Sequence, residues 1–208
     1  NNFLKVNKCE FNSQINPKKL SLNINKWIYS ELISTKNLAE KHIEDYRFDE
    51  ATRVIYKFVW NSYCDWYLEL SKTILSSNNK KDIKEVKATS GFIFKEILIL
   101  LHPFIPFITE ELWLKNKLGN KKEKYLMYVN WIKDNKARKD KEITDVNQVI
   151  DLISRIRSFK NELSVSPGSF IDISVQSVSK NKQNLFLNNE IMLKKLGRIN
   201  SIFTKDST

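Results

Sequence analysis

The chain has 208 residues, of which 41% are hydrophobic and 12% aromatic, and its formal net charge is +11. This composition is sufficient for a large core. The low number of glycines and prolines, four of each, disfavours a β fold with many tight turns. The two cysteines, Cys9 and Cys64, are too few for a disulfide framework and lack zinc-site spacing, so a reducing cytoplasm is expected. No segment is apolar enough to span a membrane, and the first residues do not resemble a signal peptide.

The positive charge favours a polyanionic partner, nucleic acid first and an acidic membrane surface second. Lysine is abundant together with asparagine and isoleucine, a pattern that nucleotide bias in a genome also produces. Part of the lysine excess is therefore expected to be solvated surface without a target.

Taken in chain order, the first half of the sequence predicts a mainly α-helical bundle over residues 1–118. Residues 1–20 are typical of the end of a helix followed by a polar loop. Apolar positions at helical spacing then predict helices over about 23–43, 49–75 and 82–102, with Asp49 as the N-cap of the second. The third helix must end near His102 because Pro103 follows, and Pro106 is suited to begin the next helix.

The stretch Tyr56–Lys72 is the most aromatic part of the predicted bundle. Its apolar side chains cover most of the helix circumference, which is typical of a central helix with neighbours on several sides. We expect Trp60 and Trp66 to hold the bundle together.

The second half of the sequence predicts a basic linker over 119–142 and a small α/β subdomain over 143–208. Ten basic and four acidic residues lie between Lys115 and Glu142, interspersed with aromatic side chains. Beyond them, Thr144 is a suitable helix cap, and residues 171–176 alternate between apolar and polar as in a half-buried strand. A further helix over about 184–196 is expected to end with Gly197 in a left-handed cap, before a second strand over 199–203.

No set of catalytic residues is recognisable in the sequence. It has no glycine-rich phosphate loop, no nucleophile paired with a base, no metal-ligand cluster and no isolated pair of acids. His102 lies at a helix end without an acidic partner nearby in sequence, so it is interpreted as a structural cap.

Three motifs carry a resemblance to a known family. They are RFDEA at residues 47–51, FVWNSYCDWYLE at 58–69 and LHPFIPFITEELW at 101–113. Together they resemble the C-terminal region of the valyl-tRNA synthetases, which are class I aminoacyl-tRNA synthetases. The resemblance covers most of the chain and is thinnest after about residue 178.

The resemblance implies that the bundle is the anticodon-binding domain of a valine–tRNA ligase and that the partner is tRNA(Val), chiefly its anticodon stem-loop. The chain itself would then be a cytoplasmic monomer with no active site, metal or cofactor. ATP would be used by a catalytic domain of the parent enzyme that is not present here, because the ATP-site signatures of the family do not occur in this sequence.

The resemblance also places the expected tRNA contacts at two edges of the bundle. Asn2 and Phe3 occupy the first edge, where relatives often carry an arginine in place of Asn2. Lys26 and Trp27 occupy the second, where Lys26 would neutralise a phosphate and Trp27 would stack on an unpaired base. The alternative for Trp27 is a place in the core. Further candidates in the preceding loop are Lys18 and Lys19.

An alternative function also fits the residues. A helical protein-interaction module with a basic surface would bind an acidic partner without RNA specificity.

Overall fold

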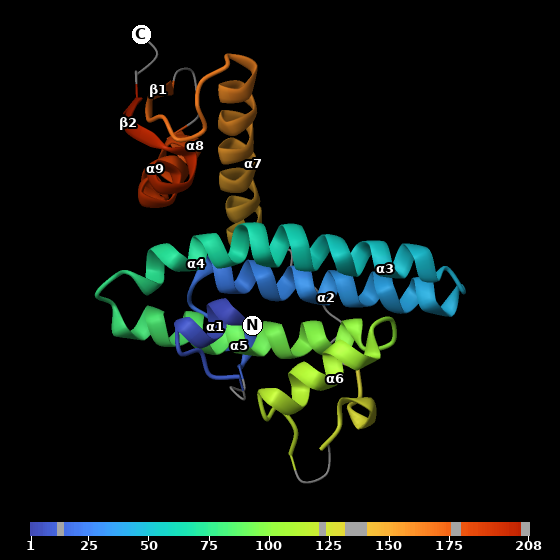
Figure 1. The fold of residues 1–208 in the computed structure, drawn as a ribbon. Helices are drawn as coiled ribbons and strands as arrows, with labels where there is room; N and C mark the ends of the chain where they lie inside the picture. Colours follow the sequence, from blue (N-terminus) through green and yellow to red (C-terminus); the bar gives the residue numbers. More distant parts are fainter. Residues whose placement is uncertain (12–14, 121–123, 132–140, 176–179, 205–208) are drawn as a thin grey trace. The chain divides into compact units, whose positions relative to one another are not determined.

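The structure is a computed structural model that describes residues 1–11, 15–120, 124–131, 141–175 and 180–204. The chain forms two compact units, unit 1 at Asn1–Lys139 and unit 2 at Asp140–Thr208. Unit 1 is built from helices (Figure 1). Its elements are α1 (Asn2–Val6), the 3-10 turn η1 (Pro17–Lys19), α2 (Asn23–Glu44), α3 (Phe48–Lys57), the π-helix η2 (Phe58–Tyr67), α4 (Leu68–Leu75), α5 (Lys80–Leu101), α6 (Pro106–Lys115) and the 3-10 turn η3 (Leu126–Tyr128).

The predicted helix boundaries agree with the structure where proline determines them, whereas α5 begins two residues before the position predicted near Asp82. The Asn79 side chain accepts the backbone amides of Lys81 and Asp82, and α5 therefore begins at Lys80. It ends just before Pro103, and α6 begins at Pro106 as predicted. The mainly α-helical bundle predicted from the sequence is confirmed.

The central helical stretch is continuous from α3 through η2 to α4 but changes its winding in the middle. Its buried side chains are spaced by three or four residues, except for one step of five between Phe58 and Tyr63. A π-helix has more residues per turn than an α-helix, so the five-residue step keeps both side chains on the buried face. The buried apolar residues are Ala51, Ile55, Phe58, Tyr63, Tyr67 and Leu70.

The same change of winding corrects the expectation that Trp60 belongs to the core. Trp60 is 55% exposed and stacks on exposed Tyr56 four residues earlier, with ring centroids 6.2 Å apart and planes 4° from parallel. Because the extra residue of η2 falls between Phe58 and Tyr63, the Trp60 ring lies outside the buried face. Trp66 is half-buried.

Two smaller expectations in unit 1 are also wrong. Asp49 is not the N-cap of α3, because Arg47 occupies that position and Asp49 lies in the first turn. The helical spacing of apolar residues over 23–43 also predicts Leu38 on the inner face of α2, but Leu38 is 49% exposed.

Part of the predicted linker packs on unit 1. Leu126 in η3 is buried, and its backbone amide donates to both carboxylate oxygens of Glu110 on α6 at 3.1 Å. Tyr125 and Tyr128 contact each other edge to face. The linker residues 121–123 and 132–140 lie outside the described residues.

Unit 2 is a small α/β unit. Its elements are α7 (Lys141–Glu162), β1 (Ile171–Val175), α8 (Lys180–Asn188), α9 (Glu190–Gly197) and β2 (Ile199–Thr204). The strands are parallel, with Ile171 opposite Ile199 and a shift of register before Ile173 pairs with Ile202. Parallel strands need a long crossover, which α8 and α9 supply.

The core of unit 2 comes from one face of α7 together with α9 and β2. Residues buried on α7 recur every three or four positions, and the last of them is Lys160. Its ammonium group donates to the carbonyls of Ser169, Gly197 and Arg198 at 2.9–3.2 Å, so it binds the free carbonyls at the end of α9. Burial lowers the pKa of Lys160, with smaller contributions from nearby Arg198 and Arg157.

Three sequence expectations in unit 2 are corrected. The helix α7 begins at Lys141, so Thr144 lies inside it. The single helix predicted over 184–196 is two helices, divided at Asn189. Gly197 is the last residue of α9, and the left-handed residue is Arg198, with φ of 53°. A Cβ at position 197 would lie 2.9 Å from the Ile199 Cδ1, so a larger residue there would require the Ile199 side chain to shift.

Candidate nucleic-acid interface

The loop before α2 presents two lysines on a short, anchored turn. Lys18 and Lys19 are exposed in η1, and the Asn16 side chain accepts the Lys18 amide at 3.0 Å. Directly after them, Leu20 is buried in a cluster with Tyr29 and Ile33. The two ammonium groups are therefore held in solvent by a turn whose next residue is fixed in the core.

Glu85 of α5 binds the chain immediately after this turn. Its carboxylate accepts the amides of Ser21 at 3.1 Å and Leu22 at 2.9 Å, the Asn25 side-chain amide at 2.9 Å, and the Ser21 hydroxyl. Leu22 is the N-cap of α2 and offers no capping side chain, so a carboxylate from another helix supplies the acceptor. Burial raises the pKa of Glu85, but these hydrogen bonds outweigh burial and hold it below its usual value.

A chain of polar groups connects Glu85 with the centre of the bundle. The Asn25 side-chain oxygen accepts the Tyr67 hydroxyl at 2.8 Å, and the Ser90 hydroxyl lies 3.5 Å from the same Tyr67 oxygen. The Tyr63 hydroxyl donates to the Ser90 carbonyl at 3.1 Å. Burial raises the pKa of Tyr67 and of Tyr63, so both remain neutral donors. The beginning of α2 is thus attached to η2 and α5.

Lys26 and Trp27, near the beginning of α2, differ in how deeply their side chains are buried. Lys26 is half-buried. Trp27 is only 2% exposed, and its ring could reach a base only if α2 left the core. The structure therefore favours the core alternative for Trp27 over base stacking, because tryptophan at this position lies on the inner face of α2.

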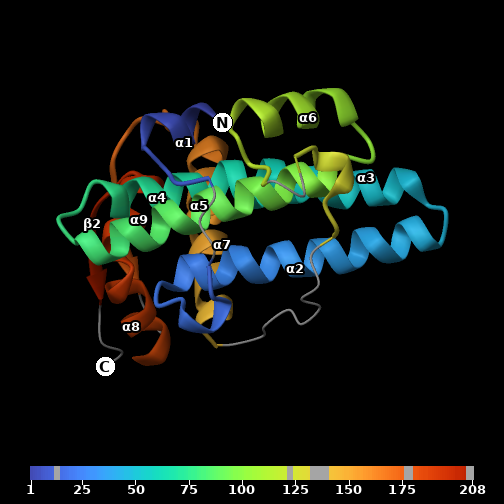
Figure 2. The same cartoon turned by 90° about the horizontal axis from the view of Figure 1, so that it is seen from below.

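The other predicted edge lies apart from these lysines. Asn2 is exposed and Phe3 half-buried on α1, where the Phe3 carbonyl accepts the Asn7 side chain at 2.8 Å. The following segment crosses α5 so closely that a Cβ at Gly91 would lie 2.1 Å from the Glu10 carbonyl oxygen. As Figure 2 shows, α1 and the beginning of α2 lie on different sides of α5 toward the same end of unit 1.

Glu85 and the lysines beside it on α5 were not predicted from the sequence. The helix begins with exposed Lys80, Lys81 and Lys84, accompanied in the first turn by a single acid, Asp82. Basic residues are unfavourable at the positive end of a helix, so these lysines do not stabilise the beginning of α5. Glu85 gave no local sign of its role, since its partners are 60–64 residues away in sequence.

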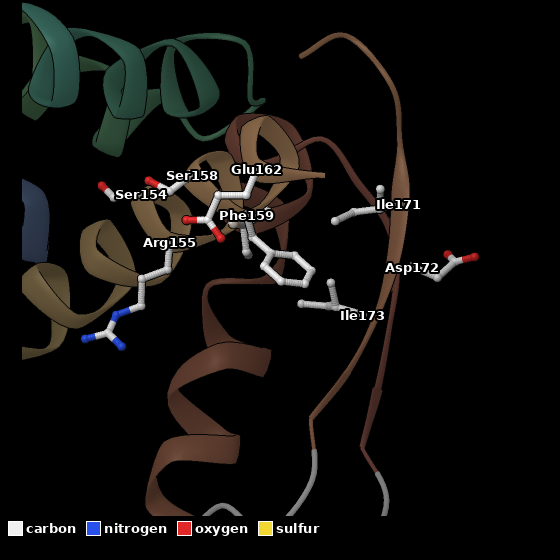
Figure 3. A pocket seen from close by; sticks show the side chains of 9 residues that line it. Ser154, Arg155, Ser158, Phe159, Glu162, Ile171, Asp172 and Ile173 are labelled. Atoms are coloured by element: carbon white, nitrogen blue, oxygen red, sulfur yellow. The ribbon is translucent and has the colours of Figure 1, made fainter. Parts of the chain in front are cut away.

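Unit 2 contains a groove of a different kind, between α7 and β1. It has a volume of about 610 Å³, and Figure 3 shows Phe159 facing Ile171 and Ile173 while Asp172 points away. Ser154 on its wall donates to the Ile150 carbonyl at 2.9 Å, and Arg155 is paired with Asp151 at 2.8 Å. The groove is thus mainly apolar, without a serine paired to a base among the described residues.

Neither a membrane span nor a metal centre is found in the described ranges. No helix in them is both long and apolar enough to cross a bilayer. They also contain no group of three histidine, cysteine, aspartate or glutamate side chains placed to hold a metal ion.

Comparison with known proteins identifies the family of the chain. Residues 25–175 match the family described as "Anticodon-binding domain of tRNA ligase". The chain is 58% identical to the valine–tRNA ligase of Pelagibacter ubique over 99% of its own length, 36% identical to that of Zymomonas mobilis over 96%, and 32% identical to that of Bartonella quintana over 98%. It spans only 22–23% of the length of these relatives. The chain belongs to the family of anticodon-binding domains of tRNA ligases, and its homologues are valine–tRNA ligases.

Proposed function

We propose that this chain binds the anticodon stem-loop of tRNA(Val) and positions the tRNA for aminoacylation by the catalytic part of a valine–tRNA ligase. The observation that carries the proposal is the family match over residues 25–175, together with identity to valine–tRNA ligases along almost the whole chain. The reaction, with its valine and ATP, would belong to the catalytic part, and the chain would act as a cytoplasmic monomer.

The contact surface in this proposal centres on the loop before α2. Lys18 and Lys19 are exposed on an anchored turn, and Lys26 follows in the first turn of α2. Asn2 and Phe3 on α1 would form a second contact on the other side of α5. Trp27 would support this surface from inside the core.

Titration with the tRNA(Val) anticodon stem-loop at several salt concentrations tests the proposal against a protein-interaction module. Each phosphate contact contributes about −0.7 to the slope of log affinity against log salt for single-stranded RNA. The double variant Lys18→Gln/Lys19→Gln should bind about tenfold more weakly. The magnitude of its salt slope should fall by the amount expected for roughly two phosphate contacts.

A matched control removes two lysines elsewhere in unit 1. Lys41 and Lys57 are both exposed, and Lys41 lies about 22 Å along α2 from Lys26. The variant Lys41→Gln/Lys57→Gln should change affinity less than twofold. Equal effects of the two double variants, or absence of salt dependence, would contradict the proposed surface.

A further inference from the structure

Glu85 is an acidic residue beside a surface that the proposed function assigns to a polyanion. Lys18 and Lys19 lie three and two residues before Ser21, which Glu85 binds. On charge alone, removal of this carboxylate should strengthen RNA binding, because it removes a repulsion from phosphate.

The hydrogen bonds of Glu85 indicate a different role. A carboxylate has about four acceptor sites, and Glu85 accepts four donors: the Ser21 amide and hydroxyl, the Leu22 amide and the Asn25 side chain. It therefore has no acceptor left to bind a base edge. All four donors lie in the loop that carries the lysines or in the first turn of α2.

The lysine turn is fixed on both sides by these contacts. Ile15 precedes the turn and packs against the cluster of Leu20, Tyr29 and Ile33, while Glu85 holds Ser21 and Leu22 directly after Leu20. Without Glu85, two backbone amides at the beginning of α2 would lose their acceptor, and only the apolar contacts would define the loop.

We propose that Glu85 is a positioning residue of the RNA interface: it fixes the turn that presents Lys18 and Lys19 and the beginning of α2 that presents Lys26. This inference rests on the proposed function. Its consequence is that loss of a negative charge weakens binding to a polyanion, because the bound geometry is no longer preorganised.

The variant Glu85→Gln tests the sign of the effect. Glutamine keeps the size of the side chain and one carbonyl oxygen, but an NH2 donor replaces the other oxygen, so about two acceptor sites remain for the four donors that Glu85 accepts. We expect it to bind the stem-loop about five- to tenfold more weakly than the unchanged protein and to lose part of the salt slope.

Asp82→Asn is the matched control. Asp82 lies on the same helix three residues earlier, and its side chain accepts the nearby Asn79 side chain at 2.8 Å, a contact local to the beginning of α5. Its neutralisation removes the same charge without releasing the loop, so affinity should stay equal or rise slightly. A Glu85→Gln variant that also binds equally or more tightly would overturn the proposal.

A combined variant separates positioning from general loss of stability. In the Lys18→Gln/Lys19→Gln background, Glu85→Gln should weaken binding by a smaller factor than in the unchanged protein, because only Lys26 remains of the three lysines that it positions. If Glu85→Gln instead lowers affinity by the same factor in both backgrounds, it acts on folding as a whole and the inference fails. If the unchanged protein does not bind the stem-loop, the proposed function itself fails.

Discussion

At the scale of single residues, Glu96 of unit 1 has a buried carboxyl group with few interactions that would stabilise its charged form. It is 8% exposed on α5, and its Oε2 has no hydrogen-bond partner within the described part of the chain. Burial raises the pKa of Glu96 to about 7, although nearby Lys95 lowers it slightly. The side chain is therefore expected to be largely protonated in the folded protein below neutral pH.

This pKa predicts a specific dependence of stability on pH. Between the ordinary value of 4.5 and about 7, the folded state binds the Glu96 proton more tightly than the unfolded state, so the free energy of unfolding falls as pH rises. The loss attributable to Glu96 is about 3 kcal/mol and is complete above pH 7. Urea unfolding of Glu96→Gln and the unchanged protein from pH 4 to 8 measures it. Parallel stability curves would contradict the assignment.

A second prediction at this scale compares two tryptophans of unit 1. Trp27 is 2% exposed, whereas Trp60 is 55% exposed. Trp27→Ala should lower the free energy of unfolding by about 3–5 kcal/mol because it leaves a large cavity. Trp60→Ala removes a largely exposed ring that stacks on Tyr56 and should cost about 1 kcal/mol. Urea unfolding followed by circular dichroism distinguishes them, and equal costs would show that the two side chains do not differ in burial.

Sequence periodicity could not separate these two tryptophans. Helical spacing placed Trp27 on an inner face, but a stacking role for it remained equally compatible with the residues. Trp60 was assigned to the core because an α-helical winding was assumed, and the extra residue that turns it outward has no local sequence signature.

At the scale of elements, the π-helix η2 behaves as an α-helix with one additional residue. The five-residue step from Phe58 to Tyr63 is the place where the additional residue is accommodated. An inserted residue rotates the side chains that follow it away from their original face unless the helix widens locally. Here the widening keeps Tyr67 and Leu70 in the core.

Deletion of exposed Asn61 tests this interpretation. It shortens the step to four residues, so η2 can wind as an α-helix while Phe58 and Tyr63 stay buried. The protein should remain folded, with a cooperative unfolding transition. Deletion of exposed Thr52 in α3 is the control, since it rotates everything after it by about 100° and should prevent folding. The interpretation fails if the Asn61 deletion is as damaging as the Thr52 deletion.

Residues 9–11, which follow α1, cross α5 closely at Gly91, and this crossing predicts the effect of a substitution there. A Cβ at Gly91 would lie 2.1 Å from the Glu10 carbonyl oxygen and 2.8 Å from its carbonyl carbon, both backbone atoms. Gly91→Ala should therefore displace this segment and raise amide exchange in α1 and residues 9–11, while α2 and α5 stay protected. Gly168→Ala is the control, because its nearest contact would be the Ser166 hydroxyl at 3.9 Å. Unchanged exchange in Gly91→Ala would contradict the close crossing.

At the scale of the whole chain, the sequence predicts the helical bundle and the small α/β part but not the contacts that assemble the interface. Pro103 and Pro106 define the end of α5 and the beginning of α6 locally, which is why these two boundaries were predictable. Glu85 and Ser21, in contrast, are 64 residues apart and meet only when α5 packs beside α2. Gly197 was predicted to form a left-handed cap, whereas Arg198 has the left-handed backbone and Gly197 lies against the Ile199 side chain.

The proposed function predicts that this chain prefers the anticodon of tRNA(Val) to other anticodons. The direct measurement is the affinity of the chain for the tRNA(Val) anticodon stem-loop and for the same stem-loop with only its anticodon bases exchanged. Since both hairpins carry the same number of phosphates, a difference reports contacts with bases. We expect the exchanged anticodon to bind at least about tenfold more weakly at the same salt concentration. Equal affinity for the two hairpins would contradict the account.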